Sequence, residues 1–197
     1  MQPQGYSVVT AVVPKKLLAV RSGLAAYGKN NITYVPGSGS FHRLVAFHTD
    51  VHCEEDPWQE PTMVERCQNC EACLRRCPTG AITADRFLLR AERCLTFHNE
   101  KDSAVAFPEW LDPAWHTCLV GCMYCQLVCP ENRHVAQWVE EGPRFSQEET
   151  ALILQGVAPG QLPDAALDGL KQFGLLDIYE VLARNLRVLL DHRDSEG

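Results

Sequence analysis

The chain has 197 residues, ten cysteines and a formal net charge of −7. A chain of this length can bury a hydrophobic core of its own, so it does not need disulfides for stability. The acidic balance argues against non-specific binding to nucleic acids, which depends on Lys and Arg neutralising phosphates.

The sequence predicts a cytoplasmic protein. It contains no apolar window long enough to cross a bilayer, so we expect no membrane contact. Its beginning, "MQPQGYSVVTAVVPKK", lacks the basic and apolar regions of a signal peptide. In a reducing compartment lasting disulfides are rare, so ten cysteines indicate metal binding or redox chemistry.

The first 60 residues read as a small α/β segment. Residues 6–13 are rich in β-branched side chains, and residues 15–28 have helical spacing that we expect to end at Gly28. Short strands are predicted at 32–35 and 41–51, on either side of a glycine-rich turn. An acidic, proline-bearing stretch then leads into the cysteine-rich region.

The last part of the chain, 136–197, reads as a helical tail. Ser146 and Glu149 form a capping box at the start of one predicted helix. A second helix should follow Pro163 and close at Gly174. A third, at 176–193, carries an apolar stripe that we expect to pack in a core rather than to bind a partner.

The cysteine-rich region, 61–135, contains two similar runs. In "CQNCEACLRRCP" the spacings are two, two and three, and a proline follows the fourth cysteine. "CMYCQLVCP" has spacings of two and three and the same terminal proline. Ferredoxins with two clusters use the run C-x2-C-x2-C-x3-C-P, in which the fourth cysteine binds the other cluster. The sequence therefore predicts two [4Fe–4S] clusters with exchanged ligands.

This exchange assigns most of the ligands. The first cluster is expected on Cys67, Cys70, Cys73 and Cys129. The second is expected on Cys77, Cys122 and Cys125, and it needs one more thiolate. Cys94 and Cys118 are both candidates. We favour Cys94, because a predicted short helix at 85–93 could return the chain to the second cluster.

Zinc is the competing interpretation, since structural zinc sites with four thiolates also use C-x2-C pairs. Eight thiolates in two interleaved sets, both ending in Cys-Pro, fit paired cubanes better. Cys53 is left without a role in either interpretation and is expected to be a free, buried thiol. Cys118, if it is not a ligand, is expected to be the same.

Five segments together resemble the iron–sulfur half of epoxyqueuosine reductases and related cobalamin-dependent reductases. They are "RSGLAAYGKNN", "GSF", "CQNCEACLRRCPTGAI", "RCLTFHNE" and "GCMYCQLVCPEN". The resemblance implies that Cys94 is a ligand of the second cluster. It also implies a corrinoid, cobalamin, as a further cofactor near eight residues: Arg21, Gly23, Gly28, Lys29, Asn30, Gly39, Ser40 and Phe41.

The resulting prediction is an α+β protein with a ferredoxin-like double [4Fe–4S] cluster domain, a small N-terminal α/β segment and a helical C-terminal tail. The resemblance implies an iron–sulfur electron-transfer protein or module of a cobalamin-dependent oxidoreductase, without the family's N-terminal catalytic domain. Its expected partners are an electron donor such as ferredoxin or flavodoxin and a corrinoid-binding domain or protein. A short acidic tail in place of the family's helical domain makes tRNA a doubtful partner. The alternative is a free-standing ferredoxin-like carrier that docks on a separate enzyme and binds no corrinoid.

Overall fold

The computed structural model describes residues 5–195 of the chain, which form two compact units. The first unit consists of residues 5–76, 82–89 and 124–137, and the second of residues 77–81, 90–123 and 138–195. The chain therefore passes back and forth between the units. The predicted segments 1–60, 61–135 and 136–197 divide the chain in sequence order and stay a prediction; their residues 1–4 and 196–197 lie outside the described part.

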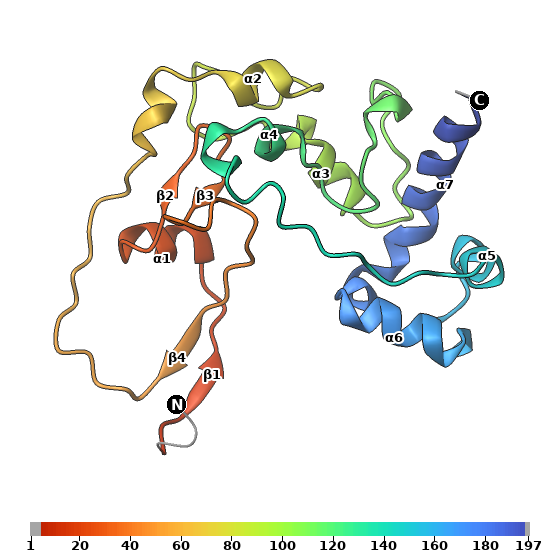
Figure 1. Ribbon diagram of the computed structural model, residues 1–197, viewed down its shortest axis with the longest axis horizontal. Helices are drawn as coiled ribbons and strands as arrows, with labels where there is room; N and C mark the ends of the chain where they lie inside the picture. The colour runs from red at the N-terminus through yellow and green to blue at the C-terminus, as the bar shows by residue number, and fades with distance from the viewer. Residues whose placement is uncertain (1–4, 196–197) are drawn as a thin grey trace. The chain divides into compact units, whose positions relative to one another are not determined.

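The first unit begins with short strands and one helix (Figure 1). Strand β1 (Val8–Thr10) pairs antiparallel with β4 (Phe47–Thr49), and β2 (Ala26–Tyr27) pairs antiparallel with β3 (Thr33–Tyr34). Helix α1 (Lys15–Arg21) buries Ala19 and Val20 in a small apolar core that also contains Ala25 and Tyr27. The strand predicted at 41–51 is limited to β4.

The helix predicted at 15–28 is too long. It ends at Arg21 because Gly23 adopts a left-handed conformation with a φ of 77°, and the chain then turns into β2. The amide of Ala25 donates to the carbonyl of Ala19 across this turn, at 3.0 Å. Six residues separate the two groups, so the turn cannot continue the i→i−4 ladder.

The first unit also contains short helices that carry cysteines. They are a 3₁₀ helix at Glu65–Gln68, α2 (Ala72–Arg76), α4 (Tyr124–Leu127) and a 3₁₀ helix at Pro130–Asn132. Helices α2 and α4 pack against each other although they are far apart in the sequence. This contact brings the first cysteine run beside the second.

The second unit is mainly helical. Its helices are α3 (Leu95–Asn99), α5 (Gln147–Gln155), α6 (Asp164–Gln172) and α7 (Tyr179–Ser195), with 3₁₀ helices at Ala91–Arg93, Pro113–Trp115, Pro159–Gln161 and Leu175–Ile178. The helix predicted at 85–93 is wrong outside Ala91–Arg93, because the amide of Arg90 donates to the carbonyl of Ala81 instead of to an i−4 partner.

The helices of the C-terminal tail confirm the sequence analysis closely. Both hydrogen bonds of the capping box between Ser146 and Glu149 are present at the start of α5. Gly174 follows α6 in a left-handed conformation, as a helix-ending glycine should. The predicted stripe on α7 is core packing, with Val181 and Leu182 fully buried. Among the described helices, none combines the length and apolar character that a bilayer span requires.

The chain therefore mixes helices with short strands, in line with the predicted α+β class. The ferredoxin-like arrangement of the two cluster loops stays a prediction.

Candidate metal centre

The four cysteines predicted to hold the first cluster all lie in the first unit. Cys67 sits in the 3₁₀ helix Glu65–Gln68, Cys73 in α2, and Cys129 immediately before the 3₁₀ helix Pro130–Asn132. Burial, together with the charges of nearby Cys67 and Cys129, raises the pKa of the Cys73 thiol to about 11. Cysteines separated by more than fifty residues thus share one electrostatic environment.

Cys67 has a similar environment. Burial raises the pKa of its thiol, as do the charges of Cys129 and Cys70, while the backbone N–H of Lys29 donates to its sulfur and opposes the rise. A protonated thiol does not bind metal, so binding at these positions must release protons. Neighbouring thiolates repel one another, and a bound cationic metal centre would relieve this repulsion.

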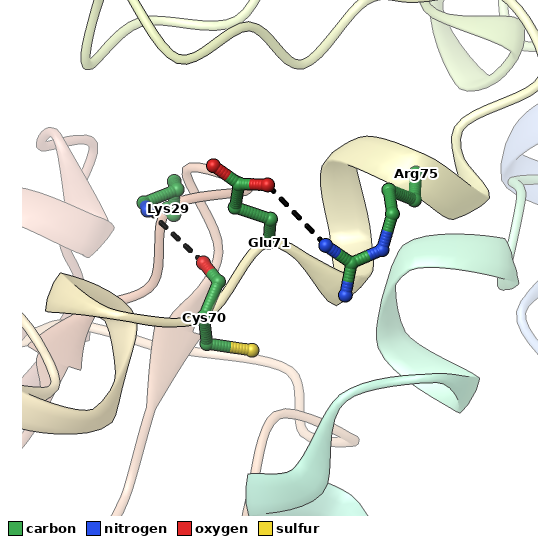
Figure 2. Close-up of polar contacts among 4 residues, drawn as sticks. All are labelled: Lys29, Cys70, Glu71 and Arg75. Atoms are coloured by element: carbon green, nitrogen blue, oxygen red, sulfur yellow. Dashed lines mark hydrogen bonds and ion pairs between the residues drawn. The ribbon is translucent and has the colours of Figure 1, made fainter.

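Lys29 connects the N-terminal segment to this cysteine loop (Figure 2). Its half-buried ammonium group donates to the carbonyl oxygen of Cys70 at 3.0 Å, and its charge also favours the thiolate of Cys67. Hydrogen bonds and cations around the sulfurs are among the factors that tune iron–sulfur clusters. Lys29, predicted as a corrinoid contact, therefore has a well-defined place beside the cysteines of the first set.

A buried pair of polar residues also contacts this set. The amide nitrogen of Asn30 donates to the hydroxyl oxygen of Tyr34 at 3.0 Å, and the two residues are 2% and 5% exposed. Burial raises the pKa of the Tyr34 hydroxyl, and a hydrogen bond with the Cys129 side chain adds to the rise. Tyr34 therefore stays protonated and can serve as a hydrogen-bond donor toward sulfur.

The predicted turn Gly39–Phe41 packs on the segment that follows Cys129. The backbone amide of Ser40 donates to the side-chain oxygen of Asn132 at 2.8 Å, and the Ser40 hydroxyl donates to the Gln126 side chain at 2.8 Å. A Cβ atom at Gly39 would lie 2.5 Å from the side-chain oxygen of Asn132. Only glycine permits this close approach at a φ of 61°.

The eight predicted corrinoid contacts thus fall into two groups. Gly28, Asn30, Gly39 and Ser40 are buried by this chain's own side chains, and each packs or bonds within the first unit. Arg21, Gly23, Lys29 and Phe41 are exposed or half-buried. Gly23 and Gly39 border a cavity of about 320 Å³, which Gln59, Glu131 and His134 also line. The buried residues fit a packing role; the corrinoid assignment stays a prediction.

The second predicted set is divided between the units. Cys77, Cys94 and Cys122 belong to the second unit, and Cys125 to the first. Cys94 is the residue directly before α3, and the sulfur of Cys77 lies 3.5 Å from the hydroxyl of Thr79. The carbonyl of Thr79 accepts a hydrogen bond from Arg93 at 2.8 Å. The choice between Cys94 and Cys118 as the last ligand stays open.

All ten cysteines lie in the described part of the chain and are free thiols. The expected burial of Cys53 is wrong, because residues 51–60 are exposed along their whole length; its thiol donates to the carbonyl of Glu55. Cys118 is half-buried beside Thr117. Among the described side chains, no group of three or more His, Cys, Asp or Glu is arranged to hold one metal ion. The four thiolates of a cubane each bind a different iron, so they need not converge on a single point.

Sequence reasoning missed three polar residues near the second set: Asn99, Arg184 and Asn185. Asn99 and Asn185 are fully buried. The signal was available for Asn185, because it falls one turn after Val181 and Leu182 on the apolar stripe of α7. A polar side chain at a core position needs a buried partner, and here the partners are the backbone carbonyls of Asn99 and Leu119.

Comparison with known families identifies the cysteine-rich region. Residues 66–132 match the model of the family described as 4Fe-4S double cluster binding domain. The match spans both cysteine runs and the loops between them. It confirms the prediction of iron–sulfur clusters.

Curated proteins similar to the chain include epoxyqueuosine reductases. The protein of Escherichia coli (strain K12) is 34% identical over 135 residues, which make up 68% of this chain and 34% of that protein. The protein of Synechocystis is 30% identical over 132 residues, or 67% of this chain and 44% of that protein. The chain therefore spans less than half the length of these relatives. It carries an iron–sulfur region similar to theirs.

Solved structures extend the likeness of fold to nearly the whole chain. An epoxyqueuosine reductase from Bacillus subtilis superposes with a TM-score of 0.64 at 23% identity, covering 95% of this chain and 49% of that chain. A reductase solved with an epoxyqueuosine-modified tRNA-Tyr stem loop has a TM-score of 0.63 at 24% identity and the same coverage. Because these superpositions cover 95% of the chain, they include most of the helical tail.

Proposed function

We propose that the chain is the electron-transfer module of an epoxyqueuosine reductase-like, cobalamin-dependent oxidoreductase. Two [4Fe–4S] clusters, when bound, would supply one-electron chemistry. The proposal assigns the first cluster to Cys67, Cys70, Cys73 and Cys129, and the second to Cys77, Cys94, Cys122 and Cys125. An external protein such as ferredoxin or flavodoxin would deliver the electrons.

The observation that carries the proposal is the environment of the first set. Cysteines from both runs lie together, and Lys29 from the "GKNN" segment bonds to their loop. A cubane with four thiolates is negatively charged, so a nearby ammonium and N–H groups directed at sulfur would stabilise it. The N-terminal segment thus supports the cluster loop through direct contacts.

The chain's own contribution to corrinoid binding would be small in this proposal. Half of the residues that the resemblance implicates are buried inside the first unit, which leaves Arg21, Gly23, Lys29 and Phe41 to meet a cofactor. A bound corrinoid would supply a redox-active cobalt. We therefore propose that a further domain or a separate protein holds most of that cofactor.

The deciding experiment is anaerobic iron and sulfide quantification of the chain, combined with electron paramagnetic resonance after dithionite reduction. We expect about eight irons per chain and the signal of two interacting cubanes. About two zinc atoms and no iron would overturn the proposal. Clusters that cannot be reduced at any accessible potential would also overturn it.

The burial of Gly28, Asn30, Gly39 and Ser40 favours a second candidate, a ferredoxin-like carrier that binds no corrinoid. Addition of hydroxocobalamin separates the two. A changed corrinoid spectrum or a changed cluster signal supports the reductase module, and unchanged spectra support the carrier. The fold likeness to a reductase solved with a tRNA stem loop also makes that RNA worth titrating, contrary to our expectation from the acidic tail.

A further inference from the structure

Asn99, at the end of α3, forms hydrogen bonds with the backbone next to Cys122. Its side-chain nitrogen donates to the carbonyl of Gly121 at 2.5 Å, and its side-chain oxygen accepts from the amide of Gly121 at 3.0 Å. The fully buried side chain of Asn99 thus bonds to both backbone polar groups of Gly121. Gly121 has a φ of 81°, which places this turn in a conformation that other residues rarely adopt.

The position of Asn99 links two of the cysteines proposed for the second cluster. Helix α3 starts directly after Cys94 and ends at Asn99, so it is a short rigid connection between them. Gly121 directly precedes Cys122. The hydrogen-bond pair from Asn99 therefore fixes the Cys122 backbone relative to Cys94, although the two cysteines are far apart in the sequence.

Helix α7 holds this connection from the other side. The side-chain nitrogen of Asn185 donates to the carbonyl of Asn99 at 2.8 Å and to the carbonyl of Leu119 at 2.9 Å. Asn185 of α7 thus bonds to both segments of the connection, the end of α3 and the segment that leads into Cys122. Asn185 is 0% exposed, so water cannot replace these bonds.

Arg184, the neighbouring residue, secures the loop after α3. Its guanidinium group donates to five backbone carbonyls, which belong to His98, Asn99, Lys101, Asp102 and Val105. It also lies over the ring of Phe107, with the guanidinium carbon 4.4 Å from the ring centroid. The two terminal nitrogens reach these carbonyls, while Nε donates to the side-chain oxygen of Asn185 at 3.1 Å. A lysine, with a single nitrogen, could not reproduce this planar fork.

The first unit contains a comparable arrangement at the other cysteine set. Asn132, also fully buried, lies three residues after Cys129 and bonds to both the amide and the hydroxyl of Ser40. It also donates to the carbonyl of Gln126, one residue after Cys125. In each unit, buried asparagine side chains thus connect a cysteine segment to its support.

We propose that Asn185 and Arg184 are positioning residues for the second cluster, acting through Asn99 and Gly121 on Cys94 and Cys122. The helical tail is then part of the cluster-holding structure. Without α7 the second set would lose its order while the first set, supported by Asn132 and Lys29 within the other unit, keeps its own. This inference rests on the proposed function, since it assumes that the clusters bind.

The test compares Asn185→Leu and Arg184→Lys with Arg187→Lys in the full chain. Arg187 lies one turn further along α7 and also donates to a backbone carbonyl, that of Leu154, so it is a matched control. We expect Asn185→Leu to reduce the iron from about eight to about four per chain, with the signal of one isolated cubane. Arg184→Lys should reduce the second cluster's occupancy in part, and Arg187→Lys should keep both clusters.

Double variants identify which cluster is lost. Asn185→Leu combined with Cys129→Ala should lose nearly all iron, whereas Asn185→Leu combined with Cys94→Ala should match Asn185→Leu alone. Full iron and an interacting signal in Asn185→Leu would overturn the inference, and so would equal loss of both clusters with unchanged helical circular dichroism. Absence of iron from the unmodified chain would instead overturn the proposed function.

Discussion

The ammonium group of Lys29 lies 3.0 Å from the carbonyl oxygen of Cys70 and donates a hydrogen bond to it. The backbone N–H of the same residue donates to the sulfur of Cys67. One residue of the N-terminal segment thus contacts two members of the first cysteine set. The segment between α1 and the cysteine runs is therefore a structural part of the first site, whatever else binds to it.

Replacement of Lys29 by Met should weaken the first site. The change removes a charge-assisted hydrogen bond, worth about 1.5–3 kcal/mol, and a positive charge beside the thiolates. We expect the midpoint potential of one cluster to fall and that of the other to stay unchanged, as measured by a redox titration. Lys16→Met is the control. Lys16 lies in α1 and its ammonium group also donates to a backbone carbonyl, that of Asn31. Equal shifts in both variants would contradict the prediction.

The last ligand of the second cluster can be assigned by iron analysis. We expect Cys94→Ala to lose about half of the iron, since a cubane short of one thiolate is poorly held. Cys118→Ala and Cys53→Ala should keep all of it. If Cys118→Ala is the variant that loses iron, the alternative assignment is correct.

Gly39→Ala and Gly37→Ala form a matched pair. Both glycines have positive φ, at 61° and 75°, and an alanine there costs about 1–2 kcal/mol of backbone strain. Only at Gly39 would the new Cβ also meet Asn132 and Val135, at 2.5 and 2.8 Å, whereas Gly37 faces open space. Denaturant unfolding should show a clearly larger loss for Gly39→Ala. Equal losses would mean that Asn132 moves aside without cost.

His116 should make the free energy of unfolding depend on pH. Burial lowers the pKa of this histidine from its ordinary 6.5, and the charge of Arg184 lowers it further. The unfolded chain then binds more protons than the folded chain just below pH 6.5, so stability falls as the pH drops through that range and recovers above it. His116→Phe should flatten this part of the stability profile.

Ser146→Ala should destabilise α5 without affecting the clusters. The change removes the bond from the Glu149 amide to the Ser146 hydroxyl, at 3.1 Å, and a lost cap costs about 1 kcal/mol. Chemical denaturation should register the loss while the iron content stays constant. Gln147→Ala, at the exposed next position, should have little effect on either measurement.

The helical tail was predictable because its signals are local. Ser146 and Glu149 are three residues apart, and Gly174 ends its helix through its own backbone conformation. The pairing of β1 with β4 carried no such signal, since Val9 and His48 are nearly forty residues apart and both are exposed. Likewise, Gly23 could be recognised as a helix terminator only by its φ, which the helical spacing around it concealed.

The cysteine sets were predictable in part for a different reason. Runs that bind cubanes have a regular cysteine spacing, from which the sequence predicts Cys129 as a partner of Cys67 and Cys73 across a long interval. The structure brings the charges of these three cysteines together, and their roles as ligands stay a prediction. The residues that support the sets have no comparable spacing rule. Asn132 bonds to Ser40, and Asn185 bonds to Asn99, through contacts that only the folded chain creates.

The alternation of the chain between its two units has a consequence for synthesis on the ribosome. The first unit needs residues 124–137, so its cysteine set remains incomplete until Cys129 has left the exit tunnel. Domains that are continuous in sequence can fold in order as they emerge, but here neither unit can finish early. The nascent chain must keep its first thiols reduced and unoccupied by unsuitable metals until Cys129 has emerged.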